Sequence, residues 1–174
     1  DINIADIQQH IGNKKIKDID VLKRIKDVAV GFTVTTLDDK VSRFLEVMAP
    51  PVSSRIQALK ELHESGIPTY AFIGPILPHF TSDEKKLNKL LDTLQEVGVK
   101  EVWFEHINLS PKIKARLFDV LKKESPELLP EFEKADTEEY RDKLENIIHR
   151  TMKGRNLRMG LGKVIHHRKL LKKN

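Results

Sequence analysis

The stretch that most constrains the fold is residues 66–79, which read Gly-Ile-Pro-Thr-Tyr-Ala-Phe-Ile-Gly-Pro-Ile-Leu-Pro-His. Its centre, residues 69–73, is short, apolar and aromatic, which is typical of a buried strand because a helix needs a longer run. Pro75 has no N–H to donate, so it is expected to stop the hydrogen-bond ladder. Helical patterns precede and follow this stretch. Loops at the carboxyl ends of parallel strands bind ligands in α/β sheets, and we therefore interpret residues 74–79 as a candidate ligand loop.

Two further strands are predicted, at residues 28–36, a β-branched run, and at residues 101–107. Amphipathic helical patterns alternate with the strands; Ser53 or Ser54 is expected to cap one of them, and Pro126 and Pro130 to mark a loop. Strands that alternate with helices predict a parallel sheet with right-handed crossovers. Three strands are too few to close a barrel, which needs about 250 residues. We therefore expect part of a larger α/β structure with an exposed sheet edge.

The composition excludes several classes of site and protein. A chain of 174 residues fits one domain, and it contains no cysteine. Disulfides, thiolate catalysis and cysteine-ligated metals or iron–sulfur clusters are therefore excluded within this chain. No apolar run approaches the ~20 residues of a membrane span, and no signal peptide is visible, which predicts a soluble cytoplasmic protein with no membrane partner.

Positive charge is concentrated at the carboxyl terminus. Residues 150–174 contain nine lysines and arginines and no acids, whereas the whole chain has a net charge of only +5. Such a segment could bind the phosphates of a nucleic acid, but it has no aromatic residue to stack on a base. We favour a solvated, partly disordered terminus. The expected division is an unassigned segment at 1–15, an α/β domain at 16–150 and a basic tail at 151–174.

The strand ends resemble those of a known superfamily, in order and spacing. The matching sequences are Gly31-Phe-Thr-Val-Thr-Thr-Leu-Asp38, Phe44-Leu-Glu-Val-Met-Ala-Pro50 with Arg55, Gly66-Ile-Pro with Ile73-Gly-Pro-Ile-Leu-Pro, and Asn108-Leu-Ser-Pro. They resemble the radical S-adenosylmethionine proteins, and within them the spore photoproduct lyase-like branch, over about residues 19–148. This resemblance implies a parallel (βα) half-barrel, the second half of a partial TIM-type barrel.

The resemblance also implies a cofactor that this chain cannot hold alone. The family binds S-adenosylmethionine beside a [4Fe–4S] cluster on a Cys-x-x-x-Cys-x-x-Cys loop, which belongs to the first half of the barrel and has no counterpart here. The chain is thus expected to be a carboxyl-terminal fragment, or a degenerate protein, that is inactive alone and pairs with the missing half or with itself through the sheet edge. By resemblance, the cofactor pocket would use Thr33, Thr35, Gly74, Pro75 and Ile76, with the threonines on one face of the sheet.

Other readings of the sequence remain open. The main alternative is a non-enzymatic α/β module that binds nucleic acid or a protein partner through the basic tail and the open sheet edge; the resemblance links its best-known branch member to DNA repair. A barrel hydrolase would need acid/base groups near Glu105 and His106, but successive strand residues face opposite ways. We interpret Glu46 and Arg55 as an exposed ion pair, with pocket orientation as the alternative. His166 and His167 are assigned to the basic tail rather than to a metal site.

Overall fold

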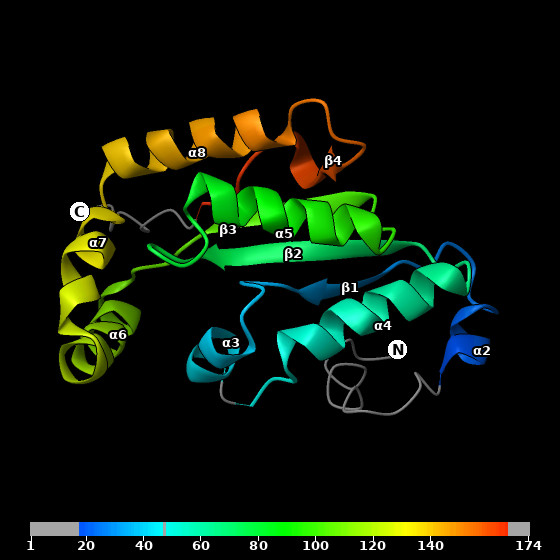
Figure 1. Cartoon of the computed structure of the whole chain (residues 1–174), viewed down its shortest axis with the longest axis horizontal. Coiled ribbons are helices and arrows are strands. Elements are labelled where there is room, and N and C mark those ends of the chain that lie inside the picture. Colours follow the sequence, from blue (N-terminus) through cyan, green and yellow to red (C-terminus); the bar gives the residue numbers. More distant parts are fainter. Residues whose placement is uncertain (1–17, 47, 167–174) are drawn as a thin grey trace, which may run out of the picture.

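The computed structural model describes residues 18–46 and 48–166, without the side chains of residues 44 and 45, so the segment predicted as unassigned at 1–15 lies outside the described residues. Strands and helices alternate along the chain (Figure 1). In order, the elements are α2 (Ile19–Leu22), β1 (Val30–Thr33), α3 (Asp39–Leu45), α4 (Val52–Glu64), β2 (Thr69–Ile76), α5 (Glu84–Glu96), β3 (Glu101–His106), α6 (Pro111–Glu124), the 3-10 helix η1 (Pro126–Leu128), α7 (Leu129–Lys134), α8 (Glu138–Met152), β4 (Arg158–Met159) and the 3-10 helix η2 (Gly160–Gly162).

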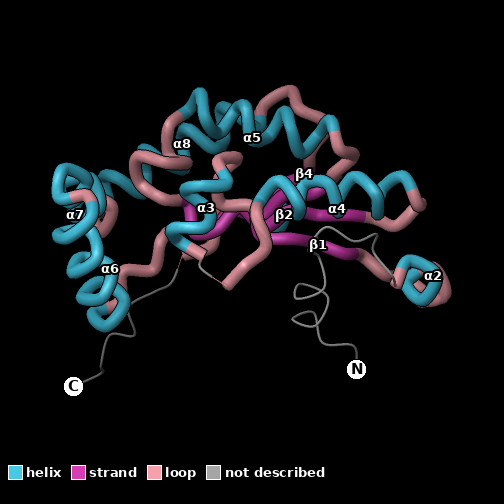
Figure 2. The backbone as a smooth tube through the Cα atoms, turned by 60° about the horizontal axis from the view of Figure 1, so that its bottom comes forward, coloured by secondary structure: helices cyan, strands magenta, loops and turns pink. Residues whose placement is uncertain are grey.

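The described strands form one parallel sheet in the order β1-β2-β3-β4. Each strand lies beside its predecessor in the chain, so right-handed crossovers place the connecting helices on the same face. Figure 2 shows α4, α5 and α8 together on one side of the sheet. This arrangement confirms the predicted α/β class and the half-barrel order of βα units. Among the described residues, β1 and the two-residue β4 each have a strand neighbour on one side only, so the outer edge of β1 is an open edge of the sheet.

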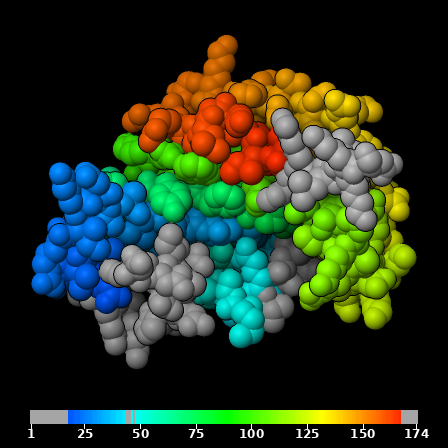
Figure 3. Space-filling model, turned by 180° about the vertical axis from the view of Figure 1, so that it is seen from behind, coloured from blue at the N-terminus to red at the C-terminus, as the bar shows by residue number. Residues whose placement is uncertain are grey.

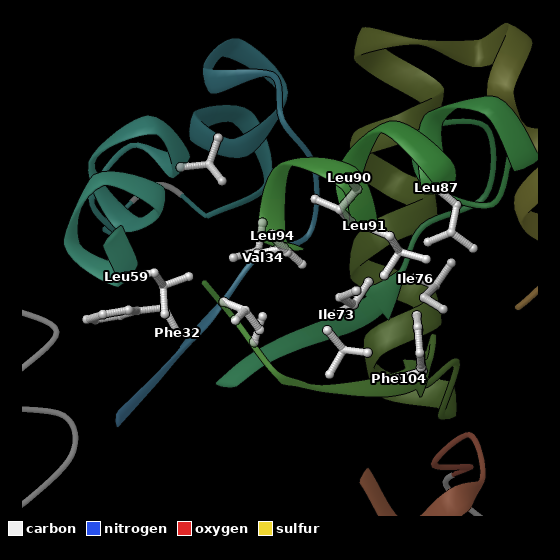
Figure 4. Close-up of a cluster of buried hydrophobic side chains, with 14 of the residues drawn as sticks. Phe32, Val34, Leu59, Ile73, Ile76, Leu87, Leu90, Leu91, Leu94 and Phe104 are labelled. Atoms are coloured by element: carbon white, nitrogen blue, oxygen red, sulfur yellow. The ribbon is translucent and has the colours of Figure 1, made fainter. Parts of the chain in front are cut away.

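The main core lies between the sheet and these helices. Alternate strand residues point into it, among them Phe32 and Phe104, which are 2% and 0% exposed. The apolar stripe of α5 packs against them, as predicted from its 3.6-residue period (Figure 4). The labelled core side chains are Phe32, Val34, Leu59, Ile73, Ile76, Leu87, Leu90, Leu91, Leu94 and Phe104. A core of this size explains why the helices stay on one face.

The opposite face of the sheet is aromatic and only half-buried. Tyr70 and Phe72 of β2 and Trp103 of β3 lie on it. The Tyr70 ring covers Gly31 so closely that a Cβ atom there would lie 2.3 Å from the ring. A side chain at position 31 would therefore displace Tyr70, which explains the glycine in the middle of β1.

The carboxyl-terminal segment is more ordered than the sequence predicts. β4 pairs with β3, Ile165 forms a further bridge to Glu105, and Val164 is only 3% exposed. Figure 3 shows this segment in orange and red against the rest of the molecule. The interpretation of a solvated terminus is thus wrong for residues 151–166, because Arg158 and Met159 pair with β3 as β4 and Ile165 bridges to Glu105. Residues 167–174 lie outside the described part.

Basic residues of this segment are paired with acids of the domain. Arg150 contacts Glu84 at 2.7 Å, and the other two pairs are Arg155 with Asp92 and Arg158 with Glu101. These ion pairs therefore neutralise part of the positive charge that the sequence concentrates near the carboxyl terminus.

Two predicted helix boundaries are also wrong. Pro126 is the first residue of η1 and Pro130 the second of α7, so neither marks a loop, since proline fits the first turn of a helix. Neither Ser53 nor Ser54 caps α4, which begins after Pro51. Ser53 instead donates its hydroxyl to the carboxylate of Asp39 at 2.6 Å. None of the described helices combines the length and apolarity that a membrane crossing would require.

Candidate functional site

The carboxyl edge of the sheet brings the predicted cofactor residues together. Thr33 pairs with Phe72, and the N–H of Val34 donates to the carbonyl of Phe72 at 2.8 Å, so the alignment of β1 with β2 continues past the end of β1. Continuing that register places Thr35 level with Gly74. The pairing of β2 with β3 is irregular between Ile73 and Ile76, where Pro75 interrupts the ladder as predicted, although the strand itself extends to Ile76.

The five predicted residues differ in accessibility. Thr33 and Pro75 are half-buried, whereas Thr35 is 2% exposed and Ile76 is fully buried in the core. Gly74 is also buried. Only Thr33 and Pro75 therefore offer side-chain surface to a bound molecule, and the other three could act through their backbone or by supporting these two.

Gly74 is required by the packing of the chain itself. A Cβ atom at this position would lie 2.5 Å from the ring of Phe72 and 2.6 Å from Cβ of Glu105. The space beside Gly74 is thus filled, on that side, by these two side chains. A ligand could reach Gly74 only through its main-chain edge.

The two threonines have different surroundings. The hydroxyl of Thr33 has no hydrogen-bond partner among the described residues, whereas Thr35 donates to Oε1 of Glu46 at 3.4 Å. Thr35 lies beyond the end of β1, so strand alternation does not govern its direction. Thr33 is therefore the threonine with a hydroxyl available at this edge.

Arg55 and Glu46 form a mostly buried pair, so the interpretation as an exposed surface pair is wrong. The side chain of Arg55 is 6% exposed and that of Glu46 is 20% exposed. Arg55 donates from Nη1 to the carbonyl of Thr33 at 2.7 Å and from Nη2 to Ser42 at 2.7 Å and to Glu46. The sequence holds a signal for this burial, because Arg55 precedes Leu59 by four residues and Leu62 by seven, on the apolar face of α4.

Hydrogen bonds from side chains to backbone carbonyls hold the loop after β2 at the carboxyl edge of the sheet. Thr81, which is 2% exposed, donates its hydroxyl to the carbonyl of Thr35, and Lys86 donates to the carbonyl of His79 at 2.8 Å. Beside this junction lies a pocket of about 510 Å³ between the loops after β1 and β2. Its lining consists of Thr36, Leu37, Asp38, Asp39, Val41, Phe80, Thr81, Lys86, Lys89 and Leu90.

The end of β3 holds no acid/base pair. Glu105 lies on the half-buried aromatic face, while His106 is 3% exposed on the helix side, as strand alternation predicts. Burial lowers the pKa of His106. The described residues contain no cluster of three potential metal ligands among histidine, cysteine, aspartate and glutamate.

Comparison with known proteins gives partial matches. No family model matches the chain. An uncharacterized protein of Methanocaldococcus jannaschii is 38% identical over 63 residues, which cover 36% of this chain and 24% of that protein. An uncharacterized protein of Acidianus two-tailed virus is 30% identical over 96 residues, which cover 53% of this chain and 32% of that protein. The chain thus matches only about a quarter to a third of the length of these curated relatives.

Solved structures give a remote similarity. Streptococcus suis SuiB bound to S-adenosylmethionine aligns with a TM-score of 0.45 at 12% identity, over 65% of this chain and 27% of that one. SuiB bound to the precursor peptide SuiA aligns with a TM-score of 0.43 at 13% identity, over 63% of this chain and 27% of that one. A similarity of this size assigns neither a function nor a ligand to this chain.

Proposed function

We propose that the carboxyl edge of this sheet forms part of an S-adenosylmethionine pocket, in a protein of the radical S-adenosylmethionine type and of its spore photoproduct lyase-like branch. The observation that carries the proposal is the half-buried hydroxyl of Thr33, which has no hydrogen-bond partner among the described residues and lies beside a carbonyl that Arg55 holds in place. Three of the four motifs support it, since they lie at or just after the carboxyl ends of β1, β2 and β3, at the same edge of the sheet.

Each residue of the edge has a defined part in this proposal. The hydroxyl of Thr33 donates to, or accepts from, the ribose or methionyl part of the cofactor. Pro75 offers an apolar contact to the adenine, and the main chain of Gly74 and Ile76 faces the base edge. Thr35 does not touch the cofactor through its hydroxyl, because that hydroxyl is bonded to Glu46. Arg55 and Glu46 are positioning residues that keep the end of β1 in one conformation.

The residues at this edge fit S-adenosylmethionine but not the iron–sulfur cluster. The Thr33 hydroxyl, an apolar proline surface and a strand-end backbone suit the polar, uncharged adenosine part of S-adenosylmethionine. The iron–sulfur cluster does not fit, because its ligands are thiolates and the 174 residues include no cysteine. S-adenosylmethionine supplies radical chemistry only where a cluster reduces it, so we assign no reaction to this chain alone. The missing ligands would come from another polypeptide segment placed along the open edge of β1.

Binding of S-adenosylmethionine to the chain tests this proposal. Saturation-transfer difference NMR detects weak complexes, and we expect signals from the adenine protons of the bound molecule. Thr33→Val keeps the branched shape but removes the hydroxyl, so affinity should fall roughly fivefold, the worth of one hydrogen bond of about 1 kcal/mol. Thr33→Ser retains the hydroxyl and should bind like the wild type. Equal binding by Thr33→Val and wild type would contradict the assignment.

The alternative of a non-enzymatic binding module has less support in the described residues. Arg150, Arg155 and Arg158 are paired with acids, so they are not available to phosphates without breaking those pairs. The open edge of β1 remains a possible place for a protein partner. Salt-sensitive nucleic-acid binding that is lost on deletion of residues 167–174 would favour this alternative.

A further inference from the structure

The carboxyl-terminal segment of the described chain is attached to β3 beside a buried histidine. The N–H of His106 donates to the carbonyl of Ile165 at 2.9 Å, and the N–H of Ile165 donates to the carbonyl of Phe104 at 2.8 Å. Val164, one residue earlier, is 3% exposed. Two backbone hydrogen bonds and one apolar side chain therefore hold residues 163–166 against the edge of the sheet.

The ring of His106 contacts the ring of His166 at the end of this segment. Their centroids are 5.5 Å apart, with an angle of 33° between the ring planes. His166 is in turn fixed to α8, because its Nε2 lies 2.5 Å from Oε1 of Glu145. The two imidazoles thus join β3, the terminal segment and α8 at one point.

The burial of His106 favours its neutral ring. Its Nδ1 lies 3.0 Å from the carbonyl oxygen of Ile107, which places the proton of the neutral ring on Nδ1. Its Nε2 is buried and has no hydrogen-bond partner among the described residues. A proton added to Nε2 would place a buried N–H without an acceptor in this site, which is costly.

The charged groups around His106 mostly oppose its protonation. Arg141 of α8 and His166 disfavour the charged ring, and Asp136, before α8, favours it more weakly. The centroid of the Tyr140 ring lies 5.9 Å from that of His106, and burial raises the pKa of its hydroxyl, so Tyr140 brings no negative charge. Burial is the largest effect and lowers the pKa of His106; the hydrogen bond to the carbonyl of Ile107 comes next and acts in the opposite direction, and the net result is a lowered pKa.

We propose that the contact between His106 and His166 is a pH-sensitive latch, which holds residues 163–166 on β3 while His106 is neutral and releases them when it takes up a proton. Release replaces the buried ring contact by two separated, solvated imidazoles and frees the two backbone hydrogen bonds. This latch is independent of the proposed cofactor pocket, which lies at β1 and β2.

The direction of the pH effect follows from linkage. The attached state has the lower affinity for protons at His106, so the latch is fully stable above the ordinary histidine pKa of about 6.5 and weakens as the pH falls below it. One proton taken up on opening raises the opening constant by up to about tenfold for each pH unit. A group whose pKa were raised on attachment would give the opposite trend.

Hydrogen exchange of the Ile165 amide measures this opening directly. After correction for intrinsic exchange, its opening constant should rise steeply between pH 7.5 and pH 5.5, whereas that of Val34, which is bonded within the sheet, should stay constant. His106→Phe keeps an aromatic ring but cannot take up a proton, so its opening constant should lose the part of the pH dependence that protonation of His106 causes. His149→Phe, at an exposed position of α8, should behave like the wild type.

Two results would overturn the latch: an Ile165 opening constant that is the same at both pH values in the wild type, or an unchanged pH dependence in His106→Phe. If His106→Phe does not fold, a measurement on the wild-type chain still tests the proposal. NMR titration of the His106 ring should then show protonation coinciding with the loss of Ile165 protection. Protonation without loss of protection would contradict the proposal.

Discussion

Arg55 donates a hydrogen bond of 2.7 Å from Nη1 to the carbonyl of Thr33, so a side chain from α4 fixes the last residue of β1. In a parallel pair, alternate residues of a strand direct both backbone groups to one neighbour, and here Val30, Phe32 and Val34 are directed to β2. The carbonyl of Thr33 therefore points toward the open edge, where Arg55 satisfies it. The same guanidinium binds Glu46, which accepts from Thr35, so one network supports both threonines.

Loss of this guanidinium should destabilise the protein strongly. Arg55→Ala leaves the carboxylate of Glu46 and the carbonyl of Thr33 without their partner in a mostly buried site. Removing one member of a buried pair costs about 3 kcal/mol, because the remaining charge is uncompensated. Arg55→Lys should recover only part of this free energy, since an ammonium cannot reproduce the forked geometry. Denaturant unfolding measures both changes.

Lys60→Ala is the matched control for Arg55. Lys60 lies on the same helix and pairs with Glu64 at 3.9 Å, but the side chains of both residues are more than half exposed. The expected change in unfolding free energy is below about 0.5 kcal/mol. A loss for Arg55→Ala no larger than that of Lys60→Ala would show that the network contributes little.

Gly74→Ala distinguishes packing from ligand contact at the strand end. The added Cβ would press on the Phe72 ring and on Glu105, so we expect a loss of about 1–3 kcal/mol in unfolding free energy. The side-chain NMR signals of Phe72 should shift. Gly154→Ala is the comparison, because its Cβ meets nothing within 4 Å, and its cost of about 1 kcal/mol should come from backbone strain alone. Unchanged stability with lost cofactor binding in Gly74→Ala would instead assign this glycine to the ligand.

The carboxylate of Asp39 gives a test of the contact between α3 and α4. The hydroxyl and N–H of Ser53 donate to it and hold its pKa below the ordinary value of 3.8. A depressed pKa contributes stability above that value, and the contribution is lost as the pH falls through the folded pKa. In Ser53→Ala the pKa of Asp39 should therefore rise toward 3.8, as measured by carbon NMR titration. Ser54→Ala should leave it unchanged, and a shift in that variant would contradict the assignment.

The fold was predictable where one pattern dominated. The β-branched run at 28–36, the aromatic run at 69–73 and the leucine stripe of α5 each have the period of the element they form, and all three appear in the structure. β4 was not predictable from such a pattern. β4 consists of only two residues, Arg158 and Met159, which are too few to show a periodicity, and it forms because the edge of β3 is there to pair with it.

The candidate site was predictable in position but not in detail. Parallel order alone brings Thr33 and Gly74 to one edge. The burial of Arg55 depends on contacts between α3, α4 and β1, which are distant in the sequence, and a charged residue is normally expected at the surface. The pairing of His106 with His166 depends likewise on the return of the chain to β3 after α8.

The most direct test of the central claim is an amide NMR titration of the whole chain with S-adenosylmethionine. We predict chemical-shift changes concentrated at the amides of Thr33, Thr35, Gly74 and Ile76, at the carboxyl edge of the sheet. Shift changes confined to the pocket lined by Asp38 and Lys89, or none at millimolar cofactor, would contradict a cofactor site at this edge.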